Sequence, residues 1–282
     1  MRPESSSPLV SVILATYNES ENIEDMIRAI LANVRDPVEV IVVDDDSPDL
    51  TWKIAGEVGD PRVKAIRRVG TRGLASAVNR GLIESRGEII SWMDADMGMP
   101  AELLPSMIQR TSEYDVVIGS RYVEGGEDAR PPIRFITSRM INAMATLVLG
   151  YGIKDYDSGF IVMRRSVLNS VTLTPTGYGS YFIEFVYACC RKGLSVVEVP
   201  YTFRDRTKGT SKSVIGPVQF LLADEIHLQT AECKPGEQQA EPQPDDGADY
   251  SISAWAGEGG SDVCLRGKVV YHTHARCMCA DG

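Results

Sequence analysis

Short apolar runs typical of buried strands alternate with segments of helical periodicity between residues 9 and 120. Strands are predicted at 10–15, 38–44, 62–69, 88–93 and 114–120, and helices at 20–34, 51–59, 74–87 and 100–113. Most of the strand runs are continuously apolar rather than alternating, as in parallel strands that are covered on both faces. The pattern therefore predicts an α/β fold with a mostly parallel central sheet and helices on both faces.

Further elements follow this region. Residues 177–193 predict a helix, 195–203 a strand and 204–213 a basic loop, while Ser20 is a suitable N-cap for the first helix. The helix predicted at 133–149 is amphipathic. One stripe is apolar (Ile133, Ile136, Met140, Ile141, Met144, Leu147 and Val148), and Arg134, Ser138 and Asn142 form a polar ridge. The apolar stripe suits either a membrane interface or packing on the sheet.

Composition limits the classes of function. The 282 residues are 43% hydrophobic and 24% charged, which is typical of a globular chain. Eleven acids fall in residues 216–282, so the rest is near neutral and nothing indicates nucleic-acid binding. The six Cys form no CxxC pair, which favours a reduced, cytoplasmic chain.

The periodicity ends near residue 223, where the chain becomes rich in Pro, Gln and acids. We expect a catalytic domain over 1–213 and an acidic tail of unknown role over 214–282. No signal-peptide pattern or apolar run of about 18–20 residues is present, so we expect a soluble or peripheral protein. The His and Cys of "HTHARCMC" (272–279) fit no familiar zinc-finger spacing.

Polar motifs follow four of the predicted strands: "TYNE" (16–19), "DDDSPD" (44–49), "DADMG" (94–98) and "GSRY" (119–122). Ligands of parallel α/β sheets bind beyond the carboxyl ends of the strands. A site is therefore predicted where these motifs meet. A Gly-rich dinucleotide site is disfavoured, because no Gly follows the first strand.

Asp94 and Asp96 are the candidate metal ligands. Residues i and i+2 of a strand share a face, and hard carboxylate oxygens suit Mg²⁺ or Mn²⁺. A metal held by so few carboxylates normally also binds phosphate oxygens of a substrate. The alternative is a pair of solvated acids that cap the helix starting near Pro100. An EF-hand loop is disfavoured, because Met99 stands where Gly is needed.

The other motifs also allow two interpretations. The acids of 44–49 either accept hydrogen bonds from a nucleobase or ribose or cap the next helix. Tyr17 either stacks on a base or supports a turn. Arg121, Arg134, Arg206 and Lys212 are either phosphate-binding cations or ordinary surface charges.

Seven motifs in order carry a resemblance: "ATYNES", "VVDDDSPD", "RGLASAV", "MDADM", "GSRYVEGG", "DSGF" and "EVPYTFRDRTKGTSK". Over residues 9–213 the chain resembles glycosyltransferase family 2, and within it the dolichol-phosphate mannose synthases. The resemblance implies a Rossmann-like GT-A fold. It also implies inverting transfer of mannose from GDP-mannose to a polyprenyl (dolichyl) phosphate at the cytoplasmic face of a membrane.

The resemblance also implies roles for individual residues. The nucleotide would be contacted by Ala15, Tyr17, Glu19, Val43 and Asp45, and the metal and diphosphate by Asp94, Ala95 and Asp96. The acceptor phosphate would be bound by Arg121, Arg134 and Ser138. The donor would also be contacted by Arg206 and Lys212 from a closing loop. The implied partners are the nucleotide sugar, the lipid phosphate, a membrane surface and a membrane-anchoring protein.

The expected chemistry agrees with the residue inventory. A phosphate acceptor is already anionic and needs positioning and charge screening rather than a general base. The three His all lie at or beyond His227. A hydroxyl acceptor would need a carboxylate base, which Asp155 or Asp157 is able to supply.

Three features depart from the family pattern. Some relatives have a metal-binding Gln where this chain has Gly98, and some have a donor-binding Lys just after "GY" (177–178), where none stands here. Many relatives continue into transmembrane helices after the basic loop. Two other functions stay open, a transferase that uses a UDP-sugar and a non-catalytic subunit that binds sugar nucleotides.

Overall fold

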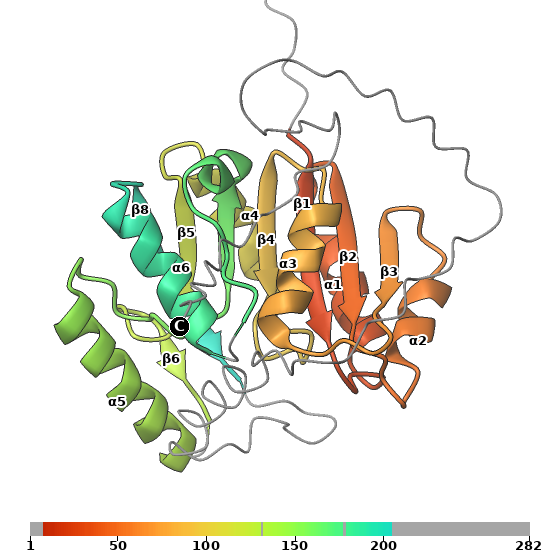
Figure 1. The fold of residues 1–282 in the computed structure, drawn as a ribbon, viewed down its shortest axis with the longest axis horizontal. Coiled ribbons are helices and arrows are strands. Elements are labelled where there is room, and N and C mark those ends of the chain that lie inside the picture. The colour runs from red at the N-terminus through yellow and green to blue at the C-terminus, as the bar shows by residue number, and fades with distance from the viewer. Residues whose placement is uncertain (1–7, 131, 177–178, 205–282) are drawn as a thin grey trace, which may run out of the picture. The chain divides into compact units, whose positions relative to one another are not determined.

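The computed structural model describes residues 8–130, 132–176 and 179–204, without the side chains of 132–134 and 137. Strands and helices alternate along most of this region (Figure 1). The strands are β1 (Val10–Thr16), β2 (Val38–Asp44), β3 (Val63–Arg67), β4 (Ile89–Met93), β5 (Val116–Ser120), β6 (Glu127–Asp128), β7 (Ile161–Arg164), β8 (Val196–Pro200) and β9 (Thr202–Phe203). The α-helices are α1 (Ile23–Asn33), α2 (Thr51–Glu57), α3 (Leu74–Glu84), α4 (Leu104–Arg110), α5 (Pro132–Leu149) and α6 (Ser180–Arg191); η1 (Ala101–Leu103) and η2 (Arg165–Asn169) are 3₁₀-helices.

The central sheet has seven strands in the order β3-β2-β1-β4-β7-β5-β8. All neighbouring pairs are parallel except those of β7, which runs antiparallel to both β4 and β5. The prediction of a mostly parallel sheet is confirmed. Strand β7 was not predicted, because four residues that end in a charged Arg164 give too short an apolar run.

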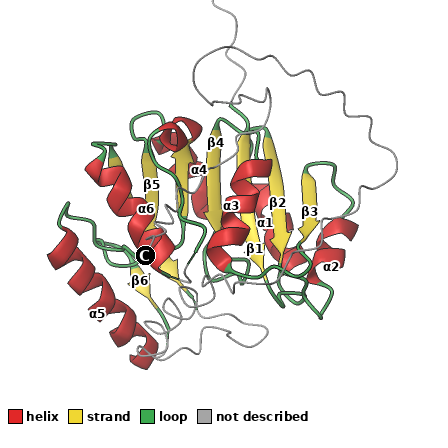
Figure 2. Ribbon diagram, in the orientation of Figure 1, coloured by secondary structure: helices red, strands yellow, loops and turns green. Residues whose placement is uncertain are grey.

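Helices cover both faces of the sheet, as predicted (Figure 2). One hydrophobic core contains Val12 and Leu14 of β1 and the buried residues of α1 and α4. The other core contains Ile13 of β1 and the buried residues of α3 and α6. Successive residues of β1 thus enter opposite cores, which explains why a buried parallel strand needs a continuous apolar sequence.

Close packing fixes these helices on the sheet. A Cβ at Gly81 of α3 would lie 2.3 Å from Cγ2 of Ile13, so only Gly lets α3 approach β1 this closely. On the same face, Trp92 makes edge-on contacts with Phe182 and Phe185 of α6, with ring centroids 6.3 and 5.4 Å away. The carboxyl ends of the strands are therefore held on a rigid support.

The strand predicted at 195–203 is wrong as a single element, because the chain changes sheets at Tyr201. The Tyr201 N–H donates to the carbonyl of Ser120 at 3.0 Å, and Tyr201 accepts from the N–H of Glu127 at 3.0 Å. Strand β8 therefore completes the central sheet, whereas β9 pairs in parallel with β6. The Arg204 N–H then donates to the carbonyl of Gly98 at 3.2 Å, which places this segment on the loop after β4.

On helix α5, the described residues of the polar ridge lie inside and most of the described apolar stripe lies outside. Ser138 and Asn142 are buried, whereas Leu147 and Val148 are 85% and 76% exposed. Ile136, Met140 and Met144 are exposed as well. The interpretation that the apolar stripe packs on the sheet is therefore wrong for these residues.

Two further outcomes concern the ends of elements. Ser20 is not the N-cap of α1; Asn22 occupies that position, without a side-chain capping bond. The basic loop beyond residue 204 and the division at 213/214 lie outside the described residues and stay predictions. No helix in the described part of the chain combines the length and hydrophobicity that a membrane span requires.

Candidate active site

Four polar loops meet at one edge of the sheet. Strands β1, β2, β4 and β5 run in the same direction, so the loops that follow them share the carboxyl edge. Three of these loops hold a left-handed residue that is not Gly, namely Asn18 (φ 56°), Asp46 (φ 56°) and Met97 (φ 65°). Such conformations are uncommon and concentrate at functional sites. The predicted location of the site therefore coincides with three strained loops.

Asp44 organises the loops after β1 and β2. Its carboxylate accepts hydrogen bonds from Thr16 Oγ1 at 2.8 Å, from Ser47 Oγ at 2.6 Å and from the N–H of Ser47 at 2.8 Å. Ser47 Oγ in turn accepts from the N–H of Asn18 at 2.9 Å. The Glu19 side chain is buried and accepts from Asn22 Nδ2 at 2.9 Å. These loops are thus tied together before any ligand is present.

Asp45 was predicted to contact the nucleotide, and its carboxylate already has two partners. Arg68 Nε donates to Oδ1 at 2.7 Å, and the N–H of Gly73 donates to Oδ2 at 2.8 Å. Arg68 was not predicted as part of this site. The bonds fix the turn before α3, whose Arg72 stacks on Tyr17 with Cζ 4.6 Å from the ring centroid.

The two remaining nucleotide-contact predictions concern apolar residues. The side chain of Val43 is fully buried in the second core, so a ligand is able to reach only its main chain. Ala15 is half-buried on β1, beside Val43 in the register of the two strands. Their contact with the nucleotide stays a prediction.

Asp94 and Asp96 lie just beyond the end of β4, not within the strand. Alternation nevertheless persists, since Ala95 between them is 3% exposed and packs in the first core. Asp96 Oδ1 accepts from the N–H of Gly98 at 3.0 Å, which closes a tight turn. Helix η1 begins after Pro100, which as N-cap residue makes no side-chain capping bond, and the interpretation of the two acids as helix caps stays open.

The acidic loop fits a divalent cation that is shared with a substrate. No group of three or more His, Cys, Asp or Glu side chains able to hold a metal occurs among the described residues. Two carboxylates alone leave most positions of an octahedral Mg²⁺ or Mn²⁺ site open to water and phosphate oxygens.

Gly98 is required by the segment that crosses it. A Cβ at this position would lie 2.9 Å from Cζ of Phe203, 3.0 Å from the carbonyl oxygen of Arg204 and 3.0 Å from Oδ1 of Asp96. A Gln side chain of the kind found in some relatives therefore has no room here. The departure at Gly98 follows from the packing of β9 on the acidic loop.

Arg121 follows β5 and is 4% exposed. Its guanidinium forms a bidentate ion pair with Asp155, and its Nη2 also donates to the carbonyl of Asp157 at 2.8 Å. Burial opposes protonation, but the Asp155 carboxylate outweighs it and raises the pKa of Arg121 well above its usual value. Arg121 is thus a permanent cation whose charge is largely balanced within the protein.

A second, half-buried cation, Arg130, was not predicted. Arg130 pairs with Asp128, with Nε 2.8 Å from Oδ1, and Asp128 Oδ2 lies 4.0 Å from Nη1 of Arg121. The ring of Phe203 lies beside both guanidiniums, 4.9 Å from Cζ of Arg130 and 5.9 Å from Cζ of Arg121. The position of the Phe203 ring has a signal in the sequence: in "YTF" (201–203), alternation places the aromatic rings of Tyr201 and Phe203 on one side of the chain.

The polar ridge of α5 packs toward this cation cluster. Asn142 Oδ1 accepts from the N–H of Asp157 at 3.1 Å. Ser138 is buried, and its hydroxyl lies near that of Tyr122 without a hydrogen-bond partner in the described region. The side chain of Arg134, and all of Arg206 and Lys212, lie outside what the structure describes.

The two carboxylates proposed as alternative bases differ in their surroundings. Both oxygens of Asp155 are bound by Arg121. Burial raises the pKa of Asp157 to about 6, with Asp155 adding to the effect and Arg121 opposing it. Of the two, Asp157 is the one that would accept a proton near neutral pH.

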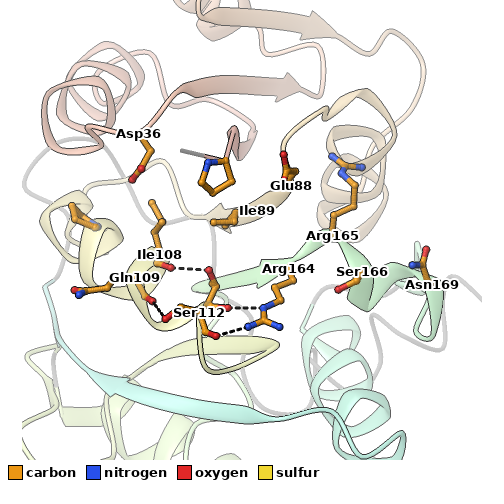
Figure 3. A pocket seen from close by; sticks show the side chains of 13 residues that line it. Asp36, Glu88, Ile89, Ile108, Gln109, Ser112, Arg164, Arg165, Ser166 and Asn169 are labelled. Atoms are coloured by element: carbon orange, nitrogen blue, oxygen red, sulfur yellow. Dashed lines mark hydrogen bonds between the residues drawn. The ribbon is translucent and has the colours of Figure 1, made fainter. Parts of the chain in front are cut away.

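The opposite edge of the sheet carries a cavity of about 960 Å³ (Figure 3). Its basic residues serve the fold. Arg164 donates to the carbonyls of Thr111 and Ser112 at the end of α4, and Arg165 donates to the carbonyl of Gly87 and to Ser85 Oγ. The strained loops, acids and buried cations all lie at the carboxyl edge, which remains the candidate active site.

Comparison with known proteins identifies the family of the chain. Residues 11–172 match the family model "Glycosyl transferase family 2". The chain is 41% identical over 209 residues to the dolichol-phosphate mannosyltransferase of Pyrococcus furiosus, a match that covers 72% of this chain and 58% of that protein. It is 35% identical over 226 residues to the polyprenol monophosphomannose synthase of Mycolicibacterium smegmatis, covering 76% and 85%. The undecaprenyl-phosphate mannosyltransferase of Micrococcus luteus is 33% identical over 215 residues, covering 72% and 86%.

Solved structures share the architecture. Glucosyl-3-phosphoglycerate synthase of Mycobacterium tuberculosis, solved with Mn²⁺, UDP-glucose and phosphoglyceric acid, superposes with a TM-score of 0.59 at 22% identity over 77% of this chain and 79% of that one. The same enzyme solved with Mg²⁺ and UDP gives a TM-score of 0.56 at 22% identity over 72% and 73%. At this identity the likeness shows the fold alone, and it confirms the predicted GT-A fold. The family model matches more than half of the length of this chain, and the chain therefore belongs to glycosyl transferase family 2.

Proposed function

We propose that the chain transfers mannose from GDP-mannose to a polyprenyl phosphate, with inversion at the anomeric carbon. The observation that carries the proposal is the position of Phe203. One edge of its ring faces Gly98 of the acidic loop, and its faces lie beside Arg121 and Arg130. A site for a metal-bound diphosphate and a site for an anionic acceptor therefore lie one aromatic ring apart.

The chain's own groups would bind and orient both substrates. The loops after β1 and β2 would hold the nucleotide, with Tyr17 against the base. The cation cluster and the Ser138 hydroxyl would hold the acceptor phosphate, whose oxygen attacks C1 as the bond from C1 to the diphosphate breaks. Because that oxygen is already anionic, no side chain needs to remove a proton. This agrees with an Asp155 whose oxygens are both engaged.

Asp94 and Asp96 would hold Mg²⁺ or Mn²⁺ on the diphosphate. The metal would neutralise the charge that develops on the leaving GDP. Arg206 and Lys212, which lie outside the described residues, are proposed to contact the donor.

The exposed stripe of α5 is proposed to lie on the membrane that carries the lipid. Its large side chains are exposed together, and the same helix presents Ser138 to the acceptor site. A helix of this kind binds in the interface without crossing it. As the family resemblance implies, we propose that the enzyme acts at the cytoplasmic face of that membrane.

Calorimetric titration with GDP-mannose and with UDP-glucose, with and without Mn²⁺, tests the donor. We expect metal-dependent binding that favours GDP-mannose. Selective binding of UDP-glucose would instead support a transferase that uses UDP-sugars. Asp96→Ala should abolish transfer and the metal-dependent part of binding, whereas the half-exposed Asp60→Ala should leave both unchanged; turnover by Asp96→Ala at the wild-type rate would remove the metal from the mechanism.

Co-sedimentation with phospholipid vesicles tests the membrane surface. We expect the wild-type chain to bind and Leu147→Glu, on the exposed face of α5, to bind less. The exposed Val69→Glu, which lies after β3, is the matched control. Equal vesicle binding by the Leu147→Glu variant would exclude this face. No binding by the wild-type chain would favour recruitment by a membrane-anchoring protein.

A further inference from the structure

Tyr201 lies between the two halves of the proposed site. Its main chain joins β5 to β6, through the carbonyl of Ser120 and the N–H of Glu127. Its ring packs edge-on against Phe160 and Phe203, with centroids 5.7 and 6.3 Å away. The side chain is 4% exposed, so its position is set by packing on all sides.

The hydroxyl of this buried side chain has no hydrogen-bond partner among the described residues. Charged groups nonetheless surround it: Arg121 and Asp155 on the acceptor side, and Asp94 on the metal side. Ser158 Oγ is also near, but it lacks hydrogen-bond geometry to the Tyr201 hydroxyl; it donates to the carbonyl of Gly119 and accepts from the N–H of Phe160 at 3.3 Å. An unpaired buried hydroxyl costs about 1–3 kcal/mol, so its retention at this position needs an explanation.

We propose that the Tyr201 hydroxyl donates a hydrogen bond to a phosphate oxygen of a bound substrate, between Asp94 and Arg121. This inference rests on the proposed function and adds a binding residue to it. A phenol is a suitable donor there, because it supplies a proton without adding charge beside Arg121. Burial raises the pKa of Tyr201 well above its usual value, so the hydroxyl keeps its proton at working pH.

The donor diphosphate and the acceptor phosphate both offer such an oxygen. Two measurements on the variant distinguish these two partners of the hydroxyl. The affinity for GDP with Mn²⁺ reports on the donor diphosphate, and the KM for a short-chain polyprenyl phosphate reports on the acceptor phosphate. Tyr201→Phe removes one oxygen and leaves the ring packing intact. Loss of a hydrogen bond to an ionised oxygen should weaken one of these constants about 10-fold or more.

Stability provides the second readout. Because the hydroxyl has no hydrogen-bond partner in the described part of the chain, Tyr201→Phe should leave the Tm unchanged or raise it. Tyr156→Phe is the matched comparison for stability. Tyr156 is equally buried but donates to the carbonyl of Gly150 at 2.9 Å, so its variant should lower the Tm.

The outcomes separate this inference from the proposed function. A wild-type chain that binds neither substrate defeats the proposed function itself. A functional wild type with a Tyr201→Phe variant that matches it in both arms overturns the role of Tyr201 alone. A Tyr201→Phe variant that unfolds, or loses several degrees of Tm, overturns it too, because the hydroxyl would then be bonded within the free protein.

Discussion

Arg121 and Asp155 form a buried bidentate ion pair, with Nε 2.8 Å from Oδ2 and Nη2 2.7 Å from Oδ1. The exposed fractions of the two side chains are 3% and 0%. The main-chain N–H of Arg121 donates to the same carboxylate at 2.9 Å. Asp155 therefore fixes the cation against β5 and offsets most of its charge. Under the proposed function, an incoming phosphate would also depend on Arg130 and the α5 ridge.

Asp155→Asn should destabilise the protein strongly. The substitution leaves the Arg121 charge buried without its counter-ion, which typically costs about 3–5 kcal/mol. Urea unfolding should show this loss as a lower midpoint. The exposed pair of Arg28 and Glu24 in α1 provides the control, because Glu24→Gln should change the free energy of unfolding by less than about 1 kcal/mol. Equal stabilities of the two variants would mean that the buried pair contributes nothing.

Gly98→Ala tests the packing of β9 on the acidic loop. The added methyl group would overlap Phe203, the Arg204 carbonyl and Asp96, so we expect a loss of about 1–3 kcal/mol and weaker metal-dependent binding of GDP. Gly56→Ala is the matched control. In α2 a Cβ would make only an ordinary contact, 3.9 Å from Ala65, and should stabilise the helix by up to about 1 kcal/mol. A Gly98→Ala variant as stable and active as Gly56→Ala would contradict the close contact.

The sequence was sufficient to predict the parallel sheet and the edge where the polar loops meet. Both follow from local periodicity and from the shared direction of parallel strands, which need no knowledge of distant contacts. Asp94 and Asp96 were identified in the same way, although they lie in a turn rather than in the strand. Local pattern thus located the site without giving its internal geometry.

Several features that escaped prediction depend on contacts distant in sequence. Helical periodicity locates the apolar side of α5 but does not say that this side faces outward. A side chain at position 98 is excluded by Phe203 and Arg204, about 105 residues later in the sequence. The carboxylate that pairs with Arg121 belongs to Asp155, 34 residues away. Strand β7 is placed by its two neighbours rather than by its own sequence.

Arg134→Ala should raise the acceptor KM, about 10-fold or more, while it changes GDP-mannose binding little. Arg134 lies one turn before Ser138 on α5, and Ser138 is buried beside the cation cluster. Arg139→Ala is the matched control, since the exposed Arg139 stacks on Phe135 of the same helix. Steady-state kinetics with a water-soluble polyprenyl phosphate would measure both. An unchanged acceptor KM in Arg134→Ala would remove this ridge from the acceptor site.

Asp157 should make stability depend on pH. Burial raises its pKa in the folded chain from 3.8 to about 6. The folded state therefore binds a proton that the unfolded state has released between pH 4 and 6. The contribution of Asp157 to stability is fully present below about pH 4 and is lost as the pH rises through 6.

Asp157→Asn removes the charge and hence this loss. Its free energy of unfolding should exceed that of the wild type by up to about 3 kcal/mol at pH 7–8, and the difference should shrink toward pH 4. Urea midpoints measured across pH 4–8 would show the convergence. The half-exposed Asp60, whose pKa is lowered to about 2 by Arg62, supplies the contrast, because the difference between Asp60→Asn and the wild type should stay constant over this range. A constant difference for Asp157→Asn as well would mean that its carboxyl titrates normally, and that its buried position beside Asp155 does not hold the proton.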